Sequence, residues 1–265
     1  MVEKLPGGLV ARHFAGVPGC LGGGDRGCVH GFSVGSRRRL RRKLLEIDWS
    51  VVECSWLTVT YHLRWGDWRD WKRDLQAFAK RLMRRWGNGL LGWVWRLEFQ
   101  ERGAPHFHVI LLWRQGYRLP KGVLQAWSSR SWGQVIGTEH DLDAQRHGVR
   151  VEDVGPGRGG LGRLLGYLVS EMGKVRQCRL VDRESGELLA TGRVWGVVGG
   201  VPMRLGVQFD LSESGWSALI ARVNAKGREV RSWYLSSISE NWSGFTLLGS
   251  WSELETMLEG LTDDG

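Results

Sequence analysis

Two apolar segments joined by a short glycine-containing turn constrain the fold of this chain more than any other feature. Residues 92–101 and 105–113 are rich in Trp, Val, Leu and Phe, which favour strands. Between them, Arg102-Gly103-Ala104 has the length and the glycine of a three-residue hairpin loop. The sequence therefore predicts an antiparallel β-hairpin whose strands enter a hydrophobic core.

Two histidines in the second strand point to a metal site. Side chains alternate across a strand, so His106 and His108 are expected on the same face. A hairpin loop of Arg102-Gly103-Ala104 would place Gln100 opposite His106 and Glu98 opposite His108. Two imidazoles, a carboxylate and an amide then share one face, a donor set suited to Mg²⁺ or Mn²⁺ with a phosphate completing the shell.

The third protein ligand is left open among three residues. Glu98 is the first choice, and Gln100 and Glu101 are retained because a one-residue slip changes which side chain faces the histidines. The alternative to a metal site is a pair of purely structural histidines.

Three segments, in this order, resemble the HUH endonuclease domain of rolling-circle replication initiators. Trp56-Leu-Thr-Val-Thr-Tyr61 is similar to the opening strand motif, and Pro105-His-Phe-His-Val-Ile-Leu111 to the His-hydrophobic-His motif. Gly166-Tyr-Leu-Val-Ser-Glu-Met-Gly-Lys174 resembles the helix that carries a nucleophilic tyrosine and a lysine. Residues 192–196 are similar to a further segment of phage- and plasmid-type initiators. The resemblance covers residues 50–200.

The resemblance implies a site-specific single-strand DNA endonuclease and ligase that acts through a phosphotyrosine intermediate. Tyr167 is the expected nucleophile, because it alone among the four tyrosines lies on the helix after the hairpin. Lys174 follows it by seven residues, about two turns, and so shares its side of the helix. The family pattern has a lysine three residues after the tyrosine, where this chain has Ser170. Glu171 replaces the tyrosine expected three residues before Lys174, which leaves single-tyrosine chemistry.

The implied biological role is the initiation of rolling-circle replication of a phage or plasmid. Cleavage would leave a 5′-phosphotyrosine link and a free 3′-hydroxyl that primes synthesis. Two alternatives remain: a single-tyrosine transposase or relaxase with the same chemistry, and a sequence-specific DNA-binding protein that has lost cleavage.

The order of strands and helices predicts an α+β fold. Strands are expected at 54–63, 92–101, 105–113 and 148–154, and helices at 67–86, 119–135 and 160–174. This order is that of a ferredoxin-like split βαβ arrangement with a central antiparallel sheet, as in the HUH endonuclease core. We expect three regions: a flexible Gly-rich and basic arm at 1–48, the HUH endonuclease domain at 49–200, and a helical or mixed extension at 201–265.

The charge balance favours a nucleic-acid partner. The net charge is +9, and six cationic residues occupy the eight positions 36–43. The expected DNA-binding residues are Arg37, Arg38, Arg39, Arg41, Arg42 and Lys43. The alternative is that they form a solvated helix face. Expected partners are single-stranded and duplex origin DNA, together with a host helicase and DNA polymerase.

Other classes of protein fit the sequence less well. No stretch is apolar enough to span a membrane and no signal peptide is evident, so we expect the cytoplasm or nucleoid of a bacterial host. The segment Gly155-Pro-Gly-Arg-Gly-Gly160 formally fits a dinucleotide-binding loop. Pro156 removes a backbone donor where pyrophosphate would bind, which argues against that function.

Overall fold

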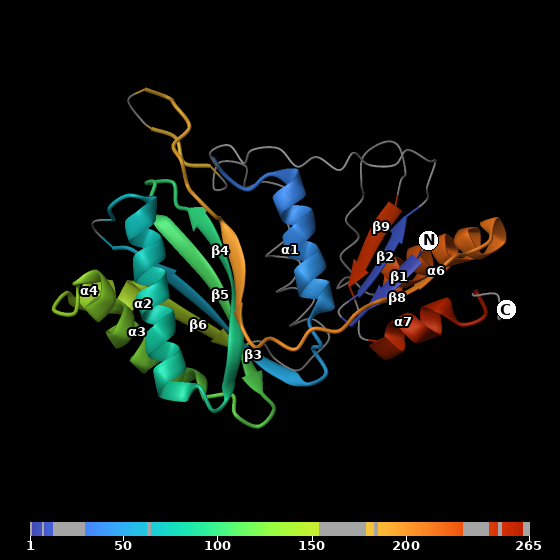
Figure 1. Cartoon of the computed structure of the whole chain (residues 1–265), viewed down its shortest axis with the longest axis horizontal. Coiled ribbons are helices and arrows are strands. Elements are labelled where there is room, and N and C mark those ends of the chain that lie inside the picture. Colours follow the sequence, from blue (N-terminus) through green and yellow to red (C-terminus); the bar gives the residue numbers. More distant parts are fainter. Residues whose placement is uncertain are drawn as a thin grey trace.

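The computed structural model describes residues 2–6, 8–12, 30–62, 65–153, 179–182, 185–229, 244–248 and 251–261. These residues form an α+β protein with two antiparallel sheets (Figure 1). The expected helix at 160–174, with Tyr167 and Lys174, lies outside the described residues. No helix in the described part of the chain is long and apolar enough to cross a membrane.

The larger sheet has five strands in the order β6-β3-β5-β4-β7. Its strands are β3 (Val52–Thr60), β4 (Leu90–Phe99), β5 (Pro105–Arg114), β6 (Val149–Asp153) and β7 (Trp195–Gly199). All neighbours are antiparallel, so β3 and β4 run in the same direction on either side of β5. The α+β class and the central antiparallel sheet expected from the order of the elements are thus confirmed. The connecting helices are α2 (Trp68–Trp86), α3 (Lys121–Ile136) and the short α4 (Leu142–His147).

Helices α2 and α3 cover one face of this sheet, here called the helix face (Figure 1). Its contacts include the Trp71 and Phe99 rings, whose centroids lie 5.6 Å apart, and the Tyr61 and Trp132 rings at 5.3 Å. The other face, here called the histidine face, carries His106 and His108. Part of it is covered by α1 (Val34–Glu46), which lies between the two sheets in Figure 1.

Helix α2 forms where the sequence predicts it because both its start and its apolar side are encoded locally. Asp67 and Asp70 form a reciprocal capping box at the N-terminus. Trp71, Leu75 and Phe78 recur at helical spacing and are buried against the sheet. The exposed side of the helix is basic.

The second sheet joins the two ends of the chain. Its strands are β1 (Val2–Leu5), β2 (Gly8–Arg12), β8 (Val207–Phe209) and β9 (Gly244–Leu248), in the order β8-β1-β2-β9. Two helices accompany it, α6 (Glu213–Glu229) and α7 (Trp251–Leu258). Its hydrophobic core includes Leu9, Leu219 and Leu254, all fully buried.

The expectation of a flexible segment at 1–48 is therefore wrong for the residues described there. Residues 2–12 supply β1 and β2, and residues 34–46 form α1. The buried side chains of Leu40, Leu44 and Leu45 hold α1 in the main hydrophobic core. Sequence analysis missed these strands, which pair with each other and with the distant strands of residues 207–209 and 244–248.

Candidate functional site

The β4–β5 hairpin differs from the expected one in the position of its loop. The Gln100 N–H donates to the Ala104 carbonyl at 2.9 Å, and the Gly103 N–H donates to the Gln100 carbonyl at 2.8 Å. The loop is thus Glu101-Arg102-Gly103, with Gly103 at φ +85°, instead of Arg102-Gly103-Ala104. A three-residue loop that ends on a glycine in the left-handed region is a common hairpin closure.

This one-residue displacement of the loop changes the strand register by two residues. Glu98 pairs with His106, and Arg96 pairs with His108. The expected pairings of Gln100 with His106 and of Glu98 with His108 are therefore wrong. Because the shift is even, Glu98 still lies on the histidine face with both imidazoles.

A compact polar cluster forms around His108. Its Nε2 lies 3.1 Å from Glu98 Oε2, and its Nδ1 lies 3.3 Å from Thr58 Oγ1 on β3. The His106 ring stands nearly perpendicular to it, with centroids 4.6 Å apart. Glu98 and His108 are each only 3% exposed, whereas His106 is half-buried. His106 is therefore more accessible than Glu98 and His108.

Arg96 belongs to the same cluster and was not expected from the sequence. Its guanidinium is fully buried, with Nη2 3.0 Å from Glu98 Oε1, and it stacks over the Phe32 ring at 4.7 Å. A buried carboxylate needs such a cation, because burying an unpaired charge costs several kcal/mol. A signal was present in the sequence: Arg96 and Glu98 are the two charged residues within an otherwise apolar strand.

The donor set partly fits a divalent cation. Adjacent ligands of an octahedral Mg²⁺ with bonds of about 2.1 Å stand about 3 Å apart, close to the 3.1 Å between Glu98 Oε2 and His108 Nε2. Across the described residues, however, no three His, Cys, Asp or Glu side chains are grouped closely enough to hold a metal ion. Glu98 and His108 thus form a pair beside His106.

The two reserve candidates for the third ligand are less suitable than Glu98. Gln100 Oε1 accepts a hydrogen bond of 2.9 Å from Arg102 Nε, and Glu101 is exposed on the turn. The choice among the three stays a prediction.

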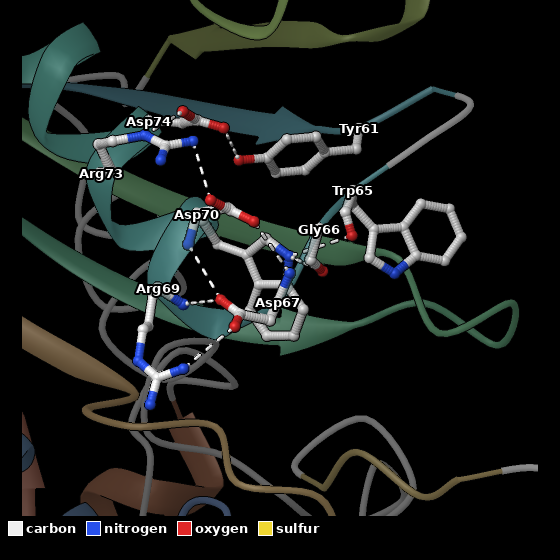
Figure 2. Close-up of polar contacts among 9 residues, drawn as sticks. Tyr61, Trp65, Gly66, Asp67, Arg69, Asp70, Arg73 and Asp74 are labelled. Atoms are coloured by element: carbon white, nitrogen blue, oxygen red, sulfur yellow. Dashed lines mark hydrogen bonds and ion pairs between the residues drawn. The ribbon is translucent and has the colours of Figure 1, made fainter.

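Neither tyrosine in the described part of the chain lies beside His108. Tyr61 is on the helix face, where its hydroxyl donates to Asp74 Oδ2 at 2.8 Å (Figure 2). Burial and the neighbouring Asp74 raise the pKa of Tyr61 well above its usual range, which makes it a poor nucleophile. Tyr117 follows the opposite end of β5. Tyr167 and Tyr234 lie outside the described residues.

The expected DNA-binding cluster lies on α1 and divides into two groups. Arg38 and Arg39 are exposed. Arg42 instead binds Glu3 through two contacts of 2.5 and 2.6 Å and Glu46 at 2.7 Å, so it ties α1 to β1. Lys43 binds Glu46 at 2.6 Å. Arg37 and Arg41 are half-buried, and the role of the whole cluster in DNA binding stays a prediction.

A buried lysine lies on the helix face, behind the histidines. Lys72 of α2 places its Nζ over the Trp95 ring at 4.6 Å and over the Phe107 ring at 5.4 Å. Burial, together with repulsion from Arg193, lowers the pKa of Lys72 to about 7. Phe107 separates His106 from His108 in sequence, so the lysine and the two histidines contact opposite faces of one strand.

Comparison with known proteins gives a consistent result for the central part of the chain. Residues 54–146 match the profile of a family of replication-associated proteins, described as the ORF2 and gene 2 protein type. A curated relative, the replication-associated gene 2 protein of Pseudomonas phage Pf3, is 32% identical over 117 residues. This alignment covers 43% of the present chain and 39% of the phage protein, so the chain spans about two fifths of its relative. No solved structure matches the chain significantly.

Proposed function

We infer that this chain belongs to the family of replication-associated proteins of the ORF2 and gene 2 protein type, whose profile residues 54–146 match. We propose that it is an HUH-type replication initiator that nicks one DNA strand at an origin. The reaction would be a metal-assisted tyrosine transesterification. The free 3′-hydroxyl would then prime rolling-circle synthesis with a host polymerase and helicase.

One observation supports this proposal above the others. The side chains of Glu98, His106 and His108 share one face of the central hairpin, and Glu98 contacts His108 at 3.1 Å. All three lie within the stretch that matches the replication family.

In the proposed reaction, the Tyr167 oxygen attacks the scissile phosphorus and loses its proton. The bond from phosphorus to the 3′ oxygen breaks, and that oxygen leaves as a 3′-hydroxyl after gaining a proton. The 5′ phosphate stays on the tyrosine, so one phosphodiester bond is exchanged for another and the strand can later be rejoined. Lys174 would stabilise the charge on the leaving oxygen.

His106, His108 and Glu98 would hold Mg²⁺ or Mn²⁺, which would polarise the scissile phosphate. The chain's own residues preorganise that site. Thr58 fixes the ring of His108 through Nδ1. Arg96 holds Oε1 of Glu98, so Oε2 is the carboxylate oxygen directed at His108.

A cleavage-dead DNA-binding protein is the second candidate, favoured by one feature of the sequence. Three residues after Tyr167 the chain has Ser170, where cleaving relatives of the HUH class are expected to have a lysine. A transposase or relaxase would use the same chemistry, and the neighbouring genes distinguish these from an initiator.

The test is nicking of a supercoiled plasmid that carries a candidate phage origin, in the presence of Mn²⁺. We expect open circles, and a tyrosine-linked oligonucleotide on Tyr167 by mass spectrometry. Tyr167→Phe should form neither, and Tyr234→Phe serves as the matched control because Tyr234 lies outside residues 50–200, which carry the HUH resemblance. His106→Ala should stop nicking and leave duplex binding intact. Bound metal without any adduct would favour the cleavage-dead candidate.

A further inference from the structure

A small pocket lies at the end of β5 opposite the histidines. It has a volume of about 360 Å³ and is formed by the last turn of α2, the α2–β4 connection and the segment after β5. Trp86, Trp113, Tyr117 and Leu119 supply its apolar walls.

The aromatic walls are held firmly by their surroundings. Trp86 packs against Trp127 with centroids 4.4 Å apart, and more loosely against Trp113 at 6.2 Å. The Tyr117 segment is fixed by Glu53, whose Oε2 accepts from the Gly116 N–H at 2.9 Å. Tyr117 nevertheless remains 53% exposed. The pocket thus presents one fixed ring and one accessible ring.

The rim of the pocket is strongly cationic. Arg84 and Arg85 of α2 belong to the pocket lining and are exposed, and the Arg85 guanidinium stands 6.0 Å from the Trp86 ring centroid. No acidic side chain lines the pocket among the described residues. Residues 75–97 and 102–138, which include all of these elements, contain no Asp or Glu. Lys80, Arg114 and Lys121 add further exposed positive charge in these stretches.

We propose that this pocket binds one unpaired nucleotide of a DNA strand, with its base on Tyr117 and Trp86 and its phosphates on Arg84 and Arg85. This inference rests on one part of the proposed function, namely that the protein binds DNA. Aromatic rings beside cationic side chains are the features that bind single strands without sequence preference. An acidic peptide would use the arginines but would gain little from the aromatic walls.

The position of the pocket sets the size of the contacted strand. From His106 to Trp113 along β5 is seven residue steps, or about 24 Å at roughly 3.4 Å per residue. The pocket lies on the helix face and the histidines on the other face, so a strand in contact with both must pass around the sheet, and about seven nucleotides at the roughly 3.4 Å spacing of stacked bases is the minimum. Oligonucleotides shorter than this would reach only one of the two sites.

The experiment uses the full chain and a 16-nucleotide single strand carrying 5-iodouracil, a photo-crosslinking base. We expect a crosslink to Tyr117 or Trp86, identified by mass spectrometry. Tyr117→Ala should weaken single-strand binding about tenfold in fluorescence anisotropy, the usual size of one stacking contact. Gly89→Ala should act similarly, because an added Cβ would lie 2.6 Å from the Tyr117 ring.

Arginine variants test the phosphate contacts. Arg84→Gln combined with Arg85→Gln should lower the slope of log affinity against log salt by about 1.4, at roughly 0.7 for each single-strand contact. Arg146→Gln, an exposed arginine on α4, is the matched control and should leave the slope unchanged.

Three outcomes would overturn the inference. The first is the absence of a crosslink to either ring, together with a loss of single-strand affinity below twofold in Tyr117→Ala. The second is an equal loss of affinity for duplex and for single strand in that variant. The third is displacement of the bound strand by polyglutamate to the same extent with and without Tyr117. Failure of the proposed function is separable. A crosslink at Tyr117 without any nicking would support the nucleotide pocket and contradict the initiator function. Nicking without a crosslink would support the initiator function and contradict the nucleotide pocket.

Discussion

At the residue scale, buried charge dominates both faces of the central hairpin. Arg96 and Glu98 form an ion pair beneath the histidines, and Lys72 lies between aromatic rings behind them. Arg96 and Glu98 were visible in the sequence as charges within an apolar strand, whereas Lys72 stands among other charged residues and carried no such signal. Alternation predicted that Glu98 shares a face with the histidines, and the strand register confirms that shared face. The cross-strand partner of Glu98 was predicted wrongly, because it depends on the position that Gly103 takes within the loop.

Lys72 should make stability depend on pH. The unfolded lysine keeps its proton to about pH 10.4, whereas the folded one loses it near pH 7, so the unfolded state binds more protons between these values. Stability should therefore rise with pH across this window, by about 1.4 kcal/mol per unit at most. Lys72→Met should remove this slope and stabilise the protein most below pH 7. Urea unfolding of both proteins at several pH values measures the difference, and identical slopes would contradict the assignment.

Arg96→Met should destabilise the protein by about 3 kcal/mol, because it leaves the Glu98 carboxylate buried without its cation. Replacing both partners, with Arg96→Met and Glu98→Gln together, should recover at least half of that loss. Urea unfolding of the two single variants and the double variant forms the cycle. Strictly additive losses would mean that the pair does not interact.

At the element scale, local signals predicted α2, α3 and the strands of the larger sheet, because caps, apolar spacing and alternation are short-range. The register of the hairpin was wrong by two residues, because Gly103 occupies the last position of the loop and not the middle position. Helix α1 was anticipated only as an alternative to a flexible arm. Its leucines at positions 40, 44 and 45 carry the helical spacing, but the surrounding arginines obscure it.

Asp67→Ala should cost about 1 kcal/mol of stability, since the carboxylate accepts from the backbone N–H groups of Arg69 and Asp70. Asp67→Asn should retain most of the cap and serves as the control. The Tyr61–Asp74 hydrogen bond further along α2 is left intact by both changes (Figure 2). Equal losses in the two variants would point to charge, not capping, as the source of stability.

At the scale of the whole molecule, helix α1 is attached to the second sheet through the ion pair between Arg42 and Glu3 of β1. Deleting residues 1–44 would remove β1, β2 and most of α1 together, so it would test folding before DNA binding. Arg38→Gln with Arg39→Gln is the cleaner change, because both side chains are exposed. If they contact duplex phosphates, the salt slope should fall by about 1.8, at roughly 0.9 per contact. An unchanged slope in anisotropy titrations would identify them as solvated surface residues.

The placement of β1 and β2 in the middle of the second sheet also bears on how the protein is made. On the ribosome, Gly8 is synthesised 240 residues before its pairing partner Leu248. The nascent chain must therefore carry an incomplete sheet edge while those residues are made, a state prone to pairing with other chains. The five-stranded sheet, complete by residue 199, can close long before. Interruption of synthesis just after residue 199 would thus release a complete five-stranded sheet together with β1 and β2 that lack their neighbours β8 and β9.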